Sequence, residues 1–209
     1  MTLRLYIHPD NPQQRLIKQA VHSLQSGGVI IYPTDTSYAL ACHIGDKNAL
    51  DRIRFIRRLD EKHHFTLMCR GLSEIGDYAR VDNPAYRLIK YLTPGPFTFI
   101  LPATREVPRR LMHPKRKTVG LRVPQNVIAQ SLLEEMGEPL MSTTLILPGE
   151  EQPLTDPDDI AQFFNGKVDV LIDGGYGGLD LTTMLDLTVT PPAVLRQGVG
   201  NIDELMSEK

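Results

Sequence analysis

Hydrophobic and polar positions repeat with two different spacings along this chain, and the two spacings predict two kinds of element. Apolar residues three and four positions apart predict helices, the first with Asn11 as N-cap, Pro12 in its first turn and Gly27 at its end. Short apolar runs rich in β-branched residues predict strands. The predicted helices cover residues 12–26, 46–56, 73–79, 82–92, 127–136 and 156–164. The predicted strands cover residues 29–32, 38–44, 65–69, 97–101, 119–123, 140–147, 168–172, 184–187 and 193–196.

The order of these elements indicates an α/β fold. Helices and strands alternate with short connections, which favours a twisted sheet of mixed parallel and antiparallel strands with helices on both sides. The chain has 209 residues, 41% of them hydrophobic, and no repeat or low-complexity linker divides it. We therefore expect one domain over residues 1–209.

Three observations bear on location and on metals. The apolar runs are too short to span a bilayer, and residues 1–4 lack the basic and then apolar layout of a signal peptide. Cys42 and Cys69 are widely separated and form no Cys-x-x-Cys motif, so we interpret them as small core residues. The sequence therefore predicts a cytoplasmic protein with no membrane contact, no disulfide and no metal site.

The strand predicted at residues 29–32 leads directly into a polar turn. Pro33 ends the strand, and Thr34, Asp35 and Thr36 follow it with two hydroxyls and one carboxylate. Polar side chains at the carboxyl end of a strand are where α/β sheets usually hold small ligands. The turn is equally well interpreted as an ST or Asx turn that satisfies only its own backbone.

Four short segments of the chain form a pattern that is more specific than any one of them. They are YPTDTSYAL at residues 32–40, TPGPFTFIL at 93–101, VGLRVP at 119–124 and VLRQG at 194–198. In this order they resemble the motifs of the YrdC/YciO family, which includes the threonylcarbamoyl-AMP synthases. The segments IRRLDEKHHFTLMC at 56–69 and MSTTLI at 141–146 are most similar to the YciO branch. The resemblance covers about residues 13–200 and implies a YrdC-like domain with a concave basic surface.

The resemblance also implies a reaction and a set of ligands. The synthases convert ATP, L-threonine and bicarbonate into threonylcarbamoyl-AMP and pyrophosphate, in a pathway of tRNA modification. ATP would enter with Mg²⁺, and cationic side chains would stabilise the charge that develops on the phosphates. By the motifs, Thr34 and Thr36 would hold the amino acid, Arg122 would bind a carboxylate in bidentate fashion and Arg196 would contact phosphate. The remaining candidates for this pocket are His64, Ser142, Thr144 and Thr182.

Two motifs of the synthases are altered in this chain. Where the synthases carry a Lys-x-Arg pair, an ungapped alignment places Arg57 and Leu59, although Arg58 could serve if the helix shifted by one residue. Where they carry Ser-x-Asn, this chain has Thr144 and Ile146, and an isoleucine offers no amide to a phosphate. We therefore expect a nucleotide-binding protein related to the synthases with degraded synthase motifs, compatible with slow hydrolysis of a threonylcarbamoyl-AMP-like nucleotide.

The charge distribution supports an alternative function. The net charge is −2, yet residues 105–122 carry seven basic residues against Glu106 alone. This basic segment could neutralise successive phosphates of structured RNA, such as double-stranded RNA or tRNA, and the resemblance supports double-stranded RNA. The segment could equally be a solvated loop. The candidate RNA-binding residues are Arg109, Arg110, Lys115, Arg116 and Lys117.

A glycine-rich stretch at residues 174–178 also draws attention. It lacks the Lys-Ser/Thr of a phosphate-binding loop and the Gly-x-Gly-x-x-Gly spacing of a dinucleotide site. We interpret it as a flexible turn.

Overall fold

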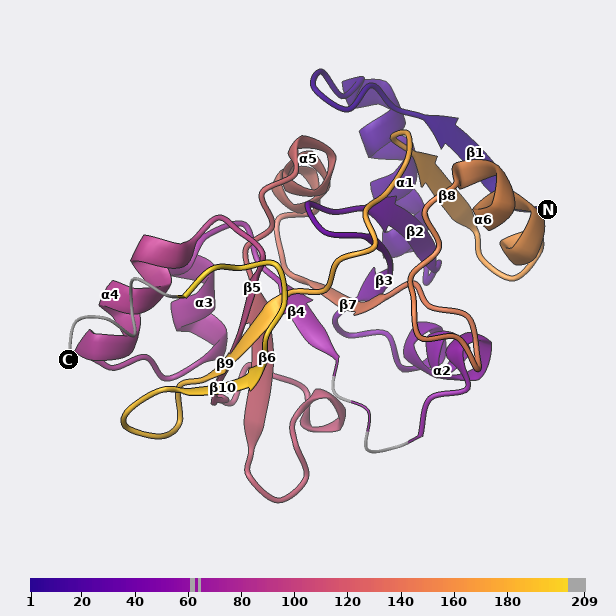
Figure 1. Cartoon of the computed structure of the whole chain (residues 1–209). Coiled ribbons are helices and arrows are strands. Elements are labelled where there is room, and N and C mark those ends of the chain that lie inside the picture. Colours follow the sequence, from indigo (N-terminus) through magenta and orange to yellow (C-terminus); the bar gives the residue numbers. More distant parts are fainter. Residues whose placement is uncertain (61–62, 64, 203–209) are drawn as a thin grey trace.

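The fold is a mixed sheet with helices packed on both faces (Figure 1). The computed structural model describes residues 1–60, 63 and 65–202. Within these residues the strands form one sheet in the order β1-β8-β2-β3-β7-β4-β6-β5-β9-β10. The helices are α1 (Gln14–Gln25), α2 (Lys47–Arg57), α3 (Leu72–Tyr78), α4 (Asn83–Leu92), α5 (Val127–Met136) and α6 (Pro157–Phe164). The strands are β1 (Leu3–Tyr6), β2 (Ile30–Pro33), β3 (Tyr38–His43), β4 (Thr66–Met68), β5 (Phe97–Pro102), β6 (Thr118–Arg122), β7 (Leu140–Thr144), β8 (Val170–Asp173), β9 (Thr183–Asp186) and β10 (Ala193–Arg196).

Side-chain caps begin four of the described helices, including α6, where Asp156 accepts a hydrogen bond from the backbone N–H of Asp158 at 2.8 Å. Asp46 accepts a hydrogen bond from the backbone N–H of Ala49 at 2.9 Å, and Asp82 and Asn126 cap α4 and α5 in the same way. Gly137 ends α5 with a φ of +78°, a conformation that glycine adopts without steric strain. These local signals explain why the predicted ends of α4 and α5 agree closely with the structure.

The beginning of α1 differs from the prediction. The helix begins at Gln14, its N-cap is Gln13, and no side chain caps it, so the predicted Asn11 cap is wrong. The imidazole Nδ1 of His8 instead accepts hydrogen bonds from the backbone N–H groups of Asp10 and Asn11. His8 therefore holds the segment before the helix in a turn, and this turn competes with the predicted cap.

Two strand predictions also need correction. Residues 3–6 form strand β1, which the sequence analysis missed, and β1 pairs in parallel with β8 at the edge of the sheet. Of its side chains only Leu5 is buried, so the strand shows little hydrophobic signal. β7 ends at Thr144 and not at residue 147, because Ile146 makes a separate bridge to Pro153.

Two hydrophobic cores lie on opposite faces of the sheet. One face packs against α1 and α5, whose Ile17, Leu24 and Leu132 lie with side chains of β2 and β8 in one core. The other face packs against α2, α3, α4 and α6 in a larger core. In β6, Val119 and Leu121 belong to the larger core. Because strand side chains alternate, Gly120 and Arg122 face the opposite side of the sheet, away from the larger core.

The structure places the two cysteines as the sequence predicts. Cys42 and Cys69 are both buried and free, and burial raises the pKa of the Cys42 thiol to about 12. Among the described residues no helix combines the length and hydrophobicity needed to cross a bilayer. In the same part of the chain, no group of three or more His, Cys, Asp and Glu side chains could hold a metal ion.

The loop of residues 174–178 is packed against the turn of residues 34–37, which corrects its interpretation as a flexible turn. The Tyr38 hydroxyl donates to the Gly175 carbonyl at 2.7 Å, and the Gly177 N–H donates to the Thr155 carbonyl at 2.8 Å. A Cβ at Gly178 would overlap the backbone carbonyl oxygen of Thr36. Glycine is therefore required here by the close approach of two backbones.

We expect Gly178→Ala to destabilise the protein. The added methyl group would force the loop away from Thr36, and overpacking of this kind costs about 1–3 kcal/mol. Thermal unfolding would show a melting temperature lower by about 2–4 °C for each kcal/mol in a chain of this size. Gly76→Ala is the matched control: Gly76 is exposed in α3 with open space at its Cβ, so alanine should stabilise the helix slightly. Equal melting temperatures for Gly178→Ala and the unmodified protein would contradict the packing argument.

Candidate functional site

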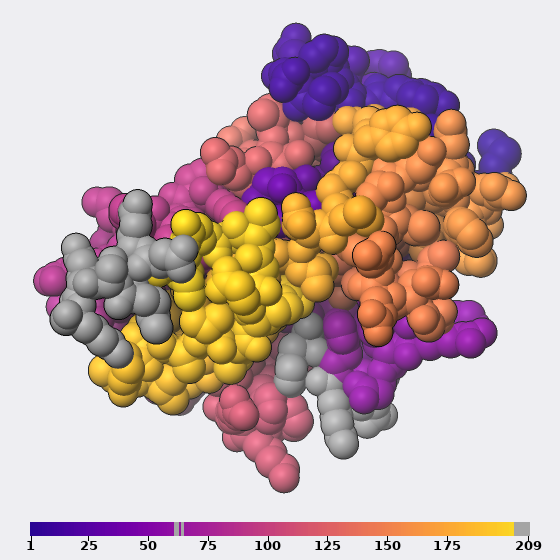
Figure 2. Space-filling model, in the orientation of Figure 1, coloured from indigo at the N-terminus to yellow at the C-terminus, as the bar shows by residue number. Residues whose placement is uncertain are grey.

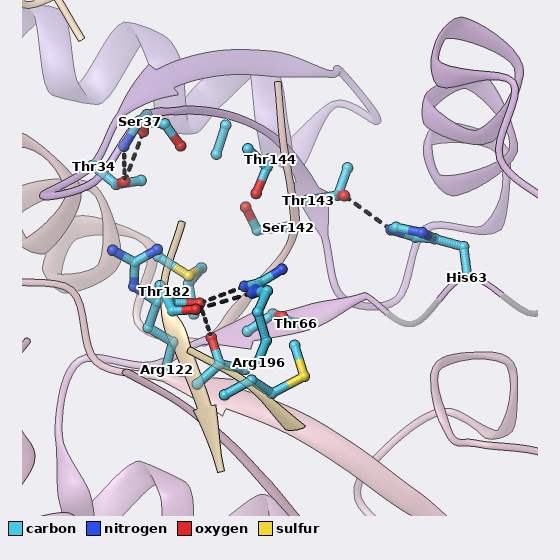
Figure 3. A pocket seen from close by; sticks show the side chains of 14 residues that line it. Thr34, Ser37, His63, Thr66, Arg122, Ser142, Thr143, Thr144, Thr182 and Arg196 are labelled. Carbon is cyan, nitrogen blue, oxygen red and sulfur yellow. Dashed lines mark hydrogen bonds between the residues drawn. The ribbon is translucent and has the colours of Figure 1, made fainter. Parts of the chain in front are cut away.

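A polar cavity of about 140 Å³ lies on one face of the sheet, where strands and loops form its wall (Figure 3). Its wall combines the turn at residues 34–37 with side chains from β3, β4, β5, β6, β7, β9 and β10. Figure 3 shows Thr34 and Ser37 on one side and Arg122, Thr182 and Arg196 on the other. The cavity therefore collects hydroxyl groups and two guanidinium groups from distant parts of the chain.

The turn after β2 has the hydrogen bonds of an ST turn. The Thr34 hydroxyl donates to the Ser37 carbonyl at 2.7 Å and accepts from the backbone N–H of Thr36 at 3.2 Å. Thr34 nevertheless lines the cavity, so the two interpretations of the turn are compatible. Hydrogen bonds within the turn fix its shape, and Thr34 and Ser37 line the cavity.

Arg122 and Asp35 form a buried ion pair beside the cavity. Arg122 Nη2 donates to Asp35 Oδ1 at 2.6 Å and to the Thr36 hydroxyl at 3.2 Å, and each charged side chain is about a tenth exposed. Arg122 Nε and Asp35 Oδ2 are buried without a hydrogen-bond partner. Buried polar atoms are normally paired, so this ion pair leaves one buried donor and one buried acceptor unsatisfied.

Arg196 is the second guanidinium of the wall. Its Nε donates to the Thr182 carbonyl at 3.0 Å and its Nη2 to the Thr182 hydroxyl at 2.9 Å. Burial and the nearby charge of Arg122 both lower the pKa of Arg196. The cavity therefore holds two like charges whose repulsion a bound anion would relieve.

Hydroxyl and imidazole groups form the opposite part of the wall. Ser142 donates to the Leu40 carbonyl at 3.0 Å and lies 3.0 Å from the Tyr32 hydroxyl. Burial raises the pKa of Tyr32 to about 12, so the phenol is neutral and can donate to Ser142. His63 Nε2 lies 3.0 Å from the Thr143 hydroxyl. The Ser142 hydroxyl thus has two neutral hydrogen-bond partners. Among the described residues, no base is hydrogen-bonded to it that could make it a nucleophile.

The structure brings most of the predicted pocket residues together. The cavity wall contains Thr34, Arg122, Ser142, Thr144, Thr182 and Arg196. Thr36 lies behind the wall, where its hydroxyl accepts from Arg122. His64 lies outside the described residues, and its neighbour His63 lines the cavity. The sequence analysis did not name Ser37, Thr66, Met68, Thr98, Thr143 and Met184, most of which alternate with core residues along their strands.

Arg57 and Arg58 do not line this cavity. Arg57 is the last residue of α2, its Nε is buried without a hydrogen-bond partner, and burial lowers its pKa to about 10. Arg58 has a positive φ of 50° and lines a different groove, beside Phe55 and Leu147. Leu59 packs against the larger core. In this arrangement α2 does not supply the cavity with the cations that its motif suggests.

The candidate RNA-binding residues lie in the loop between β5 and β6, which projects at the lower edge of Figures 1 and 2. The side chains of Arg109, Arg110, Lys115, Arg116 and Lys117 are exposed. Arg110 Nη2 donates to the Gly45 carbonyl, and Arg116 Nη1 lies 3.8 Å from Asp186 Oδ2. The loop is thus cationic, and contacts with the rest of the protein hold two of its five basic side chains.

Known proteins are similar to this chain over almost its whole length. The Sua5/YciO/YrdC family model, described as "Telomere recombination", matches residues 22–198. The uncharacterized protein YciO of Escherichia coli (strain K12) is 57% identical over 202 residues, which cover 97% of this chain and 98% of that protein. The crystal structure of E. coli YciO matches with a TM-score of 0.94 over 97% of this chain and 98% of that chain.

A second relative carries a named activity. The threonylcarbamoyl-AMP synthase of Pyrococcus abyssi is 29% identical over 191 residues, which cover 90% of this chain and 56% of the synthase. The crystal structure of P. abyssi Sua5 complexed with L-threonine matches at 28% identity with a TM-score of 0.87, over 94% of this chain and 58% of that chain. The α/β fold shared with E. coli YciO and the family model over residues 22–198 indicate the same family. The chain therefore belongs to the Sua5/YciO/YrdC family.

Proposed function

We propose that this protein binds a nucleotide related to threonylcarbamoyl-AMP in the polar cavity and acts in or near tRNA modification. The observation that carries the proposal is the pair of guanidinium groups, Arg122 and Arg196, in one cavity with hydroxyl groups. The relationship to the threonylcarbamoyl-AMP synthases and the L-threonine complex of P. abyssi Sua5 support this ligand class.

The charges of the cavity favour a ligand with a carboxylate or phosphate group. Asp35 already neutralises one of the two arginines, so the three side chains leave one positive charge. Arg196 is partly buried, and this burial lowers its pKa because its charge is less well hydrated than that of an exposed arginine. A carboxylate or phosphate placed between the guanidiniums would form charge-assisted hydrogen bonds, which are the strongest kind available in proteins.

The size of the cavity indicates which part of the ligand it encloses. Pockets for drug-sized ligands occupy about 300–1,000 Å³. The cavity measures about 140 Å³ and therefore suits an amino-acid-sized group, not a whole nucleotide. We infer that the L-threonine portion is enclosed by Thr34, Ser142 and Arg122, and that the nucleotide portion extends past Arg196.

The altered motifs support a synthase activity of this protein that is weaker than that of the threonylcarbamoyl-AMP synthases. Arg57 and Leu59 do not line the cavity, and Ile146 bonds through its backbone N–H to the Thr144 carbonyl. Transfer of an adenylyl group requires cations on the departing pyrophosphate, and here Mg²⁺ bound to ATP would supply that charge. The described residues offer no dedicated metal cluster, so the Mg²⁺ would enter with the phosphates. Slow hydrolysis of a threonylcarbamoyl-AMP-like nucleotide is compatible with the same groups.

Arg196→Ala should weaken ATP binding, as measured by isothermal titration calorimetry with Mg²⁺. Hydrogen bonds to charged groups contribute about 1.5–3 kcal/mol, which corresponds to a loss of about 10-fold to 150-fold in affinity. Arg15→Ala, which removes an exposed charge from α1, is the matched control and should bind as the unmodified protein does. Unchanged affinity for Arg196→Ala would remove Arg196 from the nucleotide site.

A product assay tests the activity itself. After incubation with ATP, Mg²⁺, L-threonine and bicarbonate, we expect mass spectrometry to detect less threonylcarbamoyl-AMP than an equal amount of the P. abyssi synthase forms. Product from this chain should disappear in Arg196→Ala. Synthesis at the rate of the P. abyssi enzyme would show that the altered motifs still complete the site, and would contradict the proposed weakening of synthase activity.

RNA binding is a second candidate function, and the exposure of the β5–β6 loop favours it. All five of its candidate basic residues are exposed, and the loop projects from the body of the molecule (Figure 2). Backbone contacts to structured RNA would suit such a loop, because they need cations and no base-specific groups. Arg110 and Arg116 already contact Gly45 and Asp186, so the other three cations are the stronger candidates.

Replacement of Arg109, Lys115 and Lys117 by Gln should flatten the salt dependence of double-stranded RNA binding. Each lost phosphate contact lowers the slope of log K against log salt by about one, so the triple variant should lose about two to three units. A variant with Gln at Arg15, Lys18 and Lys47 removes the same charge from exposed positions elsewhere. An equal slope for the two triple variants would exclude the loop as an RNA-binding surface.

A further inference from the structure

A broad groove lies between α2 and α6, the two helices at the right of Figure 1. It measures about 1320 Å³. Sites for drug-sized ligands occupy about 300–1,000 Å³, so this groove exceeds them. Both helices pack on the face of the sheet that holds the larger core, whereas the polar cavity lies on the other face. The groove is therefore separate from the proposed nucleotide site, and its size suits a protein surface.

Two phenylalanine side chains are exposed at this groove. Phe55 of α2 is 86% exposed, and Phe163 of α6 is 45% exposed. Leu59 and Leu147 are only partly buried and add apolar surface to the wall. Single exposed apolar residues are ordinary, but an apolar groove with a polar rim is typical of a protein-interaction site. The groove therefore indicates contact with another protein surface.

The rim of the groove carries cations that the described part of the chain does not neutralise. Arg52 is paired with Asp169 at 2.8 Å, so its charge is already balanced. Arg58 and Lys167 also line the groove, and neither forms an ion pair with another described residue. Two such cations beside exposed aromatic rings suit an occupant that combines apolar groups with carboxylates.

The exposed face of α6 carries both halves of such a contact. Asp159, Phe163 and Lys167 follow one another at intervals of four residues, and all three are exposed. Asp159 and Phe163 lie on the same face of the helix, and Lys167 follows its end. Phe163 is the midpoint of this run. A two-fold axis at Phe163 would therefore place Asp159 of each copy opposite Lys167 of the other copy.

α2 repeats the same order on the other wall of the groove. Asp51, Phe55 and Arg58 follow one another, with the acid nearer the start of the helix and the base just after its end. Asp51 also lies 3.7 Å from Arg54, an exposed contact of a kind that contributes little. A two-fold axis perpendicular to a helix reverses its direction, so each acid approaches a base and the helix dipoles are antiparallel. The two walls are thus complementary to themselves, which is the property of an interface between two copies of one chain.

We propose that the groove between α2 and α6 is the interface of a two-fold dimer of this chain. The Phe163 rings of the two copies meet at the axis, and with the Phe55 rings they form an apolar centre. At the rim, Asp159 of each copy pairs with Lys167 of the other copy. Because the polar cavity lies on the other face of the sheet, both copies keep it open to a ligand. The dimer therefore does not depend on the proposed function.

Phe163→Ala tests the apolar centre by sedimentation equilibrium. The dissociation constant of the dimer should rise by at least about 30-fold, because a central aromatic side chain is lost from both copies. Tyr86→Ala is the matched control: Tyr86 lies in α4 with a similar exposed fraction of 47%, away from the groove. This control should leave the dissociation constant within about twofold of that of the unmodified protein. Far-ultraviolet circular dichroism checks that each variant retains the fold.

Charge reversal tests the pairing at the rim. Asp159→Lys and Lys167→Glu each place like charges opposite one another, and each should weaken the dimer by about tenfold or more. The double variant restores opposite charges across the axis and should return to within about threefold of the unmodified protein. Because both side chains are exposed, all three variants should fold. Recovery in the double variant cannot arise from a loss of folding.

Three outcomes would overturn the proposal. An unmodified protein that stays monomeric at about 100 μM has no such dimer, and the groove would be left to a different partner protein. A dimer that Phe163→Ala leaves unchanged uses another surface. A double variant that stays as weak as the single reversals contradicts the two-fold arrangement of Asp159 and Lys167.

Discussion

The ion pair between Arg122 and Asp35 fixes the geometry on which the rest of the site depends. Arg122 ends β6 and Asp35 lies in the turn after β2, and the sheet order places β3, β7 and β4 between these two strands. The 2.6 Å contact therefore joins two parts of the sheet across its open face. Removal of one partner from a buried pair costs about 3–5 kcal/mol, so neither side chain can change alone. The charge of Arg122 also lowers the pKa of Arg196, so the electrostatic effect of the ion pair extends to β10.

Local chemistry made most of the fold predictable. Asp46, Asp82 and Asn126 are side-chain caps, and the short apolar runs became strands in the predicted order. The errors arose where tertiary contacts outweighed local signals. His8 bonds the turn before α1, and β1, which has a single buried side chain, is held by pairing with residues of β8 that lie 167 positions later in the chain. No pattern within four residues can report such a distant partner.

The site was predictable where motifs name polar side chains, and less so where the sheet selects them. Thr34, Arg122 and Arg196 stand out in the sequence as hydroxyl and guanidinium groups in a recognisable order. Thr66 and Met184 are ordinary strand residues that face the cavity only because their neighbours face the core. The placement of Arg57 depends on where α2 ends, since one residue of helix rotates a side chain by about 100°. Alternation along β4 and β9 is the signal that could have found the missed residues.

The wall of the polar cavity joins segments from Thr34 to Arg196, which are far apart in the sequence. Contacts between distant segments form slowly, because the entropy of closing a long loop must be lost before the contact is gained. The cavity is therefore complete only after β2 and β10 have both joined the sheet. A ligand that spans Thr34 and Arg196 binds the finished fold and not its precursors, so it stabilises nearly the whole chain by mass action. Binding in the cavity and folding of the chain are then thermodynamically linked.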